Sequence, residues 1–167
     1  VILRGIIPFP SIPMSFELTD ERVAAACEAA EEGDGLIFIV SQTDLSEDQP
    51  APDGLFRVGT AAQIKQTVKL PDGGLKVFVT GYCRATVNQY YYDGKRLMAD
   101  ILCKTVQTEG NGGVKGEALI LEINECYNSF ISYLPKTSPE LTAAVRSVSN
   151  PGLLADFVAS NVLLNFV

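Results

Sequence analysis

Val58-Gly59-Thr60-Ala61-Ala62-Gln63-Ile64, followed by Leu70-Pro71-Asp72-Gly73-Gly74-Leu75-Lys76-Val77, is the stretch that decides the fold. Apolar residues recur at every second position, the pattern stops at residues 71–74, and it then resumes. A period of two indicates a strand with one buried face, and a Pro-Asp-Gly-Gly run favours a tight turn. The stretch therefore predicts a β-hairpin, with buried faces formed by Phe56, Val58, Ala62, Ile64 and Val68 on the first strand and by Leu75, Val77 and Val79 on the second.

A second hairpin is predicted directly after the first. Gly81 interrupts the returning strand, and a glycine in such a place indicates a bulge or a sharp bend that curls a sheet toward a barrel. The chain then runs from Arg84 through Tyr92, turns at Asp93-Gly94, and returns through Leu97, Ala99 and Ile101. Residues 56–101 are thus expected to form a curled antiparallel sheet.

The residues before the hairpins predict one helix and one buried strand. Thr19 caps the helix, the acids that follow it suit the positive end of the helix dipole, and Gly33 ends it. Its apolar stripe consists of Val23, Ala26, Cys27 and Ala30. The unbroken apolar run Leu36 to Val40 predicts a buried strand, and the acidic, proline-containing residues 41–54 predict a solvated, mobile loop. Ahead of the helix, a short strand up to Ile7 is expected to run into a stiff loop.

Everything after Glu109-Gly110-Asn111-Gly112-Gly113 has helical periodicity. Ser138-Pro139 and Asn150-Pro151 are typical helix starts, so three helices are expected. Their apolar stripes are Ile120, Ile123, Tyr127, Phe130 and Leu134, then Leu141, Ala144, Val145 and Val148, then Leu153, Leu154, Phe157 and Val158. We expect an α+β chain with a barrel-like subdomain at residues 1–109 and a bundle of three helices at residues 110–167.

Composition excludes several classes of function. The 167 residues carry a net charge of −7 and no histidine. Imidazole chemistry is therefore absent, and an acidic chain is unsuited to nucleic acid. The chain has no P-loop, no metal-ligand spacing and no apolar run that could span a membrane, so we expect no catalytic residue, no metal, no cofactor and no membrane contact. A Ser-Lys dyad lacks any local signature here.

The cysteine spacing points to a reducing compartment. Cys27, Cys83, Cys103 and Cys126 lie far apart and form no Cys-x-x-Cys pair. Such a pattern is typical of free thiols rather than of a zinc site or a redox dithiol. We therefore expect a cytoplasmic protein.

Four stretches resemble the N-terminal, substrate-binding domain of bacterial ATP-dependent Lon proteases, and the resemblance covers essentially the whole chain. The most specific is Val58 to Ile64 continued through Leu70 to Val77 and Gly81-Tyr82-Cys83-Arg84-Ala85. The others are Leu3-Arg4-Gly5-Ile6-Ile7-Pro8-Phe9-Pro10, Phe38-Ile39-Val40-Ser41-Gln42-Thr43-Asp44, and Asn150-Pro151-Gly152-Leu153-Leu154-Ala155-Asp156-Phe157-Val158-Ala159. The chain departs from the family pattern at Pro8 and at Thr19-Asp20, which affects loop geometry.

The resemblance implies a PUA-like β-barrel followed by a helical bundle. It implies a non-catalytic module that recognises unfolded or damaged polypeptides and helps subunits of the same protein to assemble into a hexamer. The parent protein would be an ATP-dependent serine endopeptidase with a Ser-Lys dyad. Its ATP and Mg would bind an AAA+ motor domain that lies outside this chain. A stand-alone adaptor or ligand-recognition protein with the same domain is an alternative, as is a PUA-like RNA-binding module, which the acidic charge disfavours.

Two candidate binding surfaces follow from the residues. A proline-stiffened loop can hold apolar side chains out to solvent at low entropic cost, and methionine adapts to varied partners. This client-binding loop would consist of Pro8, Phe9, Pro10, Ile12, Pro13, Met14 and Phe16. The competing interpretation is that Phe9, Ile12 and Phe16 simply fill the interior of the barrel.

Tyr91 is the second candidate. Strand alternation places it on the face opposite to Tyr90 and Tyr92, and tyrosine favours interfaces because it brings a large area with few rotatable bonds. Cross-strand aromatic pairing within the sheet is the alternative role for these rings.

Overall fold

The computed structural model describes residues 1–48, 50–94, 96–104, 113–133 and 139–161. It divides into two compact units, Val1–Thr105 and Val106–Val167. Together they make a mixed α+β chain, and each unit is described by itself. The expected subdomain boundary between residues 109 and 110 lies outside the described residues.

The first unit is a six-stranded sheet with one helix. Its elements in chain order are β1 (Ile2–Leu3), β2 (Pro13–Leu18), α1 (Glu21–Glu32), β3 (Leu36–Ser41), a short 3-10 turn (Pro52–Gly54), β4 (Val58–Lys69), β5 (Leu75–Asp93) and β6 (Arg96–Lys104). The strand order is β1-β3-β4-β5-β2, and β6 pairs with β5 as well. Among the strands of the described residues, β1 and β3 form the only parallel pair. Between described residues this pairing does not close into a ring, so the closed barrel stays a prediction.

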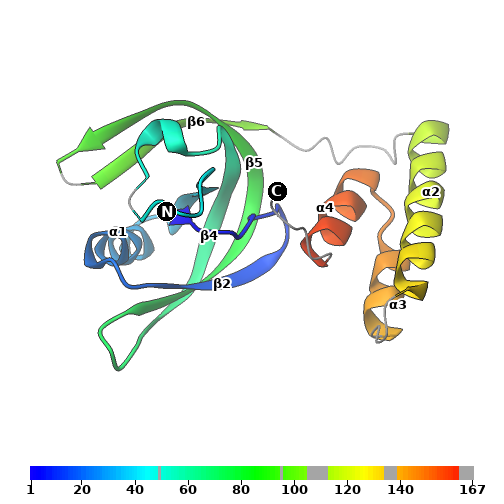
Figure 1. Ribbon diagram of the computed structural model, residues 1–167, viewed down its shortest axis with the longest axis horizontal. Coiled ribbons are helices and arrows are strands. Elements are labelled where there is room, and N and C mark those ends of the chain that lie inside the picture. Colours follow the sequence, from blue (N-terminus) through cyan, green and yellow to red (C-terminus); the bar gives the residue numbers. More distant parts are fainter. Residues whose placement is uncertain (49, 95, 105–112, 134–138, 162–167) are drawn as a thin grey trace. The chain divides into compact units, whose positions relative to one another are not determined.

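Both predicted hairpins are present. The first joins β4 to β5 and is paired from Lys69 with Leu75 to Val58 with Thr86. The second joins β5 to β6 and ends at the pair Asp93 with Arg96. The bulge expected at Gly81 is present: Ala61 pairs with Cys83 and Ala62 with Gly81, so Tyr82 is an extra residue. β5 continues past it, for 19 residues in all, as one long curved ribbon (Figure 1). One strand therefore belongs to both hairpins.

Irregularities in register explain where the predicted faces fail. Leu75, Val77 and Val79 are buried as expected, and so are Ala62 and Ile64. Between Ile64 and Gln66 the pairing skips a residue, and such a bulge moves every later side chain to the opposite face. Val68 is exposed for this reason. Phe56, which precedes β4, and Val58, its first residue, are also exposed.

The core of the first unit is formed by the inner faces of the sheet and one side of α1. Cys27 of α1 and Ile39 of β3 are fully buried in it, and Val23 and Ala30 of α1 pack against it. The other buried members are Leu3, Phe16, Leu18, Ala62, Ile64, Leu75, Val77 and Val79. The helix and the strand expected at residues 19–40 are both confirmed.

The N-terminal segment folds differently from the expected strand and loop. β1 ends at Leu3, because Gly5 has φ of 68°, which an extended strand does not permit. Residues 13–18 form β2, an additional strand that pairs with β5 from Pro13 with Thr80 to Leu18 with Leu75. A proline at the first residue of a strand is permitted, so Pro13 begins β2 rather than preventing it.

The residues between β1 and β2 cross β5 at Gly81. Ser11 N donates to Gly81 O at 2.9 Å, and Gly81 N donates to Ile12 O at 3.3 Å. A Cβ on Gly81 would collide with the carbonyl of Phe9, so only glycine permits this approach. On β4, Thr60 Oγ1 donates to Pro8 O at 2.8 Å inside the unit.

The second unit contains the three expected helices, α2 (Gly113–Ser132), α3 (Pro139–Ser147) and α4 (Pro151–Asn161). Tyr127, Val145 and Leu154, one from each helix, form its buried centre. The packing residues around them are Ile120, Ile123, Ile131, Val148, Phe157 and Val158. Leu134 and the side chain of Leu141 lie outside the described residues, and a complete three-helix bundle stays a prediction.

Asn150 caps α4 as the sequence predicts. Its Oδ1 accepts hydrogen bonds from Gly152 N at 2.9 Å and from Leu153 N at 3.1 Å. These contacts satisfy backbone donors that the first turn of a helix leaves unpaired. Pro151 follows at the first helical position, where its missing N–H costs nothing.

Replacing Gly81 by alanine should destabilise the first unit. We expect Gly81→Ala to lower the free energy of unfolding by about 1–3 kcal/mol, because the new methyl group must displace the backbone of residues 9–10. Urea denaturation followed by circular dichroism measures the change. Gly33→Ala is the matched control, since its Cβ would meet nothing closer than 3.4 Å; equal stability of the two variants would contradict the account.

Removing the cap of α4 should destabilise the second unit. Asn150→Ala is expected to cost about 1 kcal/mol, whereas Asn150→Asp keeps an acceptor oxygen and should cost less. Thermal denaturation, followed by the circular dichroism of helices at 222 nm, measures the stability of the two variants. If Asn150→Asp lost as much stability as Asn150→Ala, the acceptor oxygen at position 150 would not be what stabilises the helix.

Candidate functional site

The expected client-binding loop is largely interior. Pro8, Pro10 and Phe16 are buried, and Phe16 belongs to the main hydrophobic core. The expectation that prolines hold these side chains out is wrong for these three, because the segment packs on Gly81 and then enters the sheet as β2. Of the other four residues, Phe9, Ile12 and Met14 are half-buried and Pro13 is exposed.

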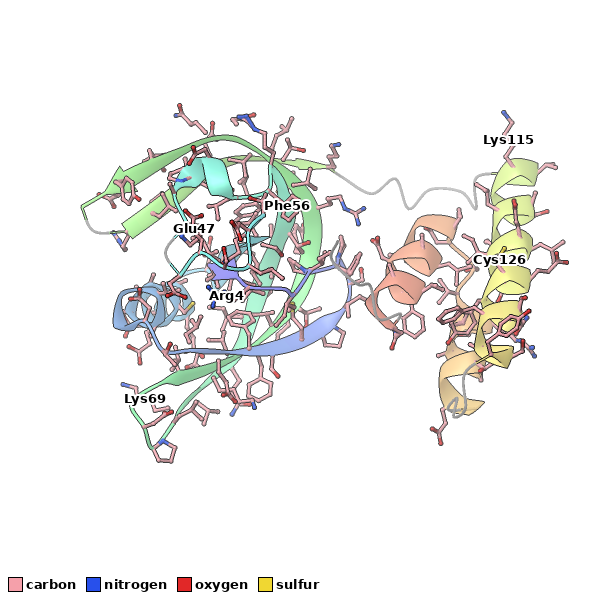
Figure 2. The ribbon with its side chains drawn as sticks, viewed as in Figure 1. Arg4, Glu47, Phe56, Lys69, Lys115 and Cys126 are labelled. Atoms are coloured by element: carbon pink, nitrogen blue, oxygen red, sulfur yellow. The ribbon has the colours of Figure 1, made fainter. Side chains whose placement is uncertain are left out.

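A second set of contacts holds the N-terminal segment against the loop that follows β3. Ser41 Oγ donates to Ile6 O, and the Arg4 guanidinium donates to Glu47 O at 2.7 Å and to Asp48 Oδ1 at 2.9 Å. Figure 2 shows Arg4 and Glu47 beside each other. Arg4 and Asp48 are both exposed, so their ion pair contributes little by itself. The contacts matter because they join two segments that are distant in sequence.

The loop after β3 is organised around the buried amide of Gln42. Its Nε2 donates to Asp44 O at 2.6 Å and to Glu47 O at 2.8 Å. The Asp44 carboxylate accepts hydrogen bonds from the hydroxyl and the backbone N–H of Ser46, and these bonds lower the pKa of Asp44. The expected mobile loop is therefore cross-linked by hydrogen bonds. Within the described residues, no three His, Cys, Asp or Glu side chains gather closely enough to hold a metal ion.

Large apolar side chains are exposed on the hairpin of β5 and β6. Tyr91 and Met98 lie directly opposite each other and are 46% and 38% exposed. Leu102, four residues along β6 from Met98, shares their face and is 62% exposed. These three residues form what we call the outer hairpin surface. Tyr91 is exposed as expected, and its role in binding stays a prediction.

The neighbouring tyrosines have different surroundings. Tyr90 is half-buried, and its hydroxyl donates to Phe56 O at 3.2 Å, which ties the hairpin to the chain before β4. Burial raises the pKa of Tyr90, with Arg57 opposing that shift. Tyr92 lies opposite Leu97 and is 66% exposed. Cross-strand pairing of the rings with each other does not occur, because β6 has no aromatic residue.

Helix α2 has apolar residues on more than one face. A groove of about 480 Å³ is bounded by α2 and Val158 of α4. The residues of α2 that line it are Leu119, Glu122, Ile123, Cys126, Tyr127 and Phe130. Val114, Leu119, Leu121 and Phe130 are exposed, which is typical of a helix that contacts a further chain segment or subunit. In the described ranges, no helix combines the length and hydrophobicity needed to cross a bilayer.

The four cysteines are free and fall into two classes. Cys27 and Cys83 are buried, whereas Cys103 and Cys126 are exposed. Cys103 pairs with Ala85, two residues from Cys83, so the two thiols occupy diagonal positions across the strand pair. Burial and the contact with Cys103 raise the pKa of Cys83 to about 11, and burial raises the pKa of Cys27.

Alkylation should separate these classes. At about pH 8, iodoacetamide is expected to modify Cys103 and Cys126 in the folded protein and to spare Cys27 and Cys83, because the thiolate is the reactive form and a raised pKa keeps the thiol protonated. The rate at Cys83 should rise as pH approaches 11. Peptide mass mapping measures each site, with urea-unfolded protein as control. Equal rates at Cys83 and Cys103 near pH 8 would contradict this burial.

Comparisons with known proteins agree on one family. The model of the ATP-dependent protease La (LON) substrate-binding domain matches residues 1–167. The chain is 33% identical to Lon protease 1 of Bacillus subtilis over 162 residues, and 34% identical to the Lon protease of Solibacter usitatus over 165. Each alignment covers 97% of this chain but 21% and 20% of the relative, so the chain spans about a fifth of their length.

Solved structures agree on the fold. The N-terminal domain of the Mycobacterium avium complex Lon protease superposes with a TM-score of 0.74 at 20% identity, covering 99% of this chain and 83% of that one. A Lon N-terminal domain protein from Xanthomonas campestris gives a TM-score of 0.58 at 10% identity, covering 97% and 96%. With the family match over its full length, the chain belongs to the LON substrate-binding domain family.

Proposed function

We propose that this chain is the non-catalytic part of an ATP-dependent Lon-type serine protease that recognises unfolded or damaged polypeptides. The observation that carries the proposal is the family match over residues 1–167, since that family is described as a substrate-binding domain. The absence of a P-loop and of a local Ser-Lys signature from the sequence fits a module whose peptidase and ATPase chemistry, with its ATP and Mg, lies elsewhere in a longer protein.

The outer hairpin surface suits such clients. Unfolded chains differ from folded ones in exposing apolar side chains, and a surface of Tyr91, Met98 and Leu102 offers apolar area without a shaped pocket. Methionine adapts to different partners, and tyrosine loses few rotatable bonds on binding. Recognition of this kind distinguishes unfolded from folded protein with little dependence on sequence.

The proposal also covers the assembly of subunits and the compartment in which the protein works. The exposed apolar residues of α2 would contact other subunits in a hexamer, because such a helix is stabilised when a partner covers it. Free thiols fit the cytoplasm. The curved sheet would be the wall of a PUA-like barrel, and α2, α3 and α4 would form a helical bundle.

Binding of an unfolded protein tests the proposal. Denatured, alkylated casein should bind this chain, and Tyr91→Ser combined with Met98→Ser should weaken binding about tenfold, since each replacement removes apolar contact area. Fluorescence anisotropy measures the affinity. The melting temperature should stay the same because both side chains are exposed. Unchanged affinity would place the client elsewhere, and no binding by the unaltered chain would overturn the proposal.

The proline-rich segment can be tested separately. Ile12→Asp with Met14→Glu should lower the melting temperature strongly, because Met14 packs against the hydrophobic core and the side chain of Ile12 is half-buried, so that both replacements place a charge against apolar groups. Differential scanning calorimetry measures the change. A stable double variant that no longer binds casein would instead assign client binding to this segment.

A further inference from the structure

Strand β6 has a neighbour on one side only. It pairs with β5 from Arg84 with Lys104 to Asp93 with Arg96, and no second strand adjoins it in the part of the chain that the structure describes. It runs along the margin of the first unit in Figure 1. Alternate residues of an edge strand direct their N–H and C=O groups away from the sheet. β6 therefore presents a row of backbone donors and acceptors along 9 residues.

The outer groups of β6 have no other backbone partner. Among the described residues, no backbone hydrogen bond joins β6 to a turn, a loop or another element besides β5. Helix α1 approaches β6, but the backbone groups of a helix are occupied within the helix itself and cannot form a ladder. Within the described residues, the outer backbone groups of β6 are thus not paired with another strand.

Two of the devices that usually block an edge, a proline and a bulge in the edge strand itself, are missing from β6. It contains no proline, and the register irregularity of this hairpin lies in β5, where Asn88 is the extra residue. Two of its three charged side chains contact residues of β5: Arg96 donates to Asp93 Oδ2 at 2.9 Å, and Asp100 Oδ2 accepts from Asn88 Nδ2 at 3.2 Å. Both partners belong to β5, so neither contact covers the open edge.

A second copy of the chain is a poor occupant of this edge. Antiparallel pairing of β6 with itself over its full length would set Asp100 opposite Asp100 and Arg96 opposite Lys104. Like charges directly opposite each other destabilise a strand pair. The pattern Arg96, Asp100, Lys104 instead favours a strand with acids at its ends and a base at its centre.

We propose that the edge of β6 binds an unfolded client as an added β-strand. This rests on the proposed function and names its mode. Hydrogen bonds to the client backbone give affinity independent of sequence, and apolar contacts on one face of β6 favour a client with apolar residues at alternate positions. Met98 and Leu102 supply that face and are exposed, whereas Leu97, Ala99 and Ile101 lie half-buried on the other. Only an unfolded segment has backbone groups free to pair, so the edge discriminates against folded protein.

A designed peptide tests the mode without altering the protein. The probe is acetylated, dye-labelled Glu-Thr-Val-Thr-Lys-Thr-Val-Thr-Glu, whose valines face Met98 and Leu102 and whose lysine faces Asp100. Its matched control exchanges every Glu for Lys and the Lys for Glu. Two further versions of the peptide carry N-methyl groups, one at its odd residues and one at its even residues. Because the N–H groups of alternate residues point to opposite edges of a strand, each version lacks the N–H donors along one edge of the peptide only.

If the peptide adds to the sheet as a strand, its affinity should depend on which alternate residues are N-methylated. One of the two N-methylated peptides should bind at least about tenfold more weakly than the probe, the other within about twofold, and the charge-exchanged control more weakly than the probe. In hydrogen exchange followed by NMR, alternate amides of β6 should gain protection when the peptide binds.

Two results would overturn the inference, and they are distinguishable. If casein and the probe bind but β6 amides keep their exchange rates and both N-methylated peptides behave alike, clients bind at another surface and the proposed function stands. If denatured casein fails to bind at all, the proposed function falls and the added strand falls with it.

Discussion

The approach of the N-terminal segment to Gly81 is the constraint on which the first unit depends. β5 is one strand of 19 residues shared by two hairpins, and its pairing with β4 skips Tyr82, next to the point where residues 9–12 lie against Gly81. A bulge of this kind bends a strand. Because the chain must cross there, Pro8 and Pro10 are buried, β2 enters the sheet in register with β5, and Thr60 satisfies Pro8 O. Any side chain at position 81 would separate these parts.

This use of the N-terminal segment decides which surfaces are left to bind a partner. The segment fills one side of β5 with its own backbone and apolar groups, and β2 occupies the edge of β5 only as far as Thr80. Beyond the bend, β5 pairs with β6, which leaves an open edge beside the exposed face of Tyr91, Met98 and Leu102. The part of the sheet against which the N-terminal segment packs is thus separate from the part that offers backbone groups and apolar area to a client.

Local patterns predicted most of the elements. Alternation with a Pro-Asp-Gly-Gly turn predicted the first hairpin, and Asp93-Gly94 predicted the second. Proline after a capping residue predicted the starts of α3 and α4. Each of these signals acts within a few residues, so it can be recognised in the sequence. β2 was missed because three prolines masked the alternation of Met14, Phe16 and Leu18, which is a strand pattern. The reversal of faces after Ile64 has no local signal, since a bulge depends on both strands.

The candidate site was predicted less well, for reasons of tertiary structure. Apolar residues beside prolines suggest an exposed loop, but their burial depends on Gly81, which is some 70 residues further along the chain. Gln42 could have been noticed as a polar residue at the end of a buried strand, where an amide often organises the following loop. Tyr91 was identified from alternation alone, whereas the open edge beside it becomes visible only when the strand order is known.

Photo-crosslinking from single positions tests the central claim, that clients bind the part of the sheet beyond the bend. A benzoylphenylalanine at position 91 should form a crosslink with denatured casein, and one at position 68, equally an exposed apolar site but before the bend, should not. Native, folded protein should give no product from either. Crosslinking from position 68 with none from position 91 would contradict the account.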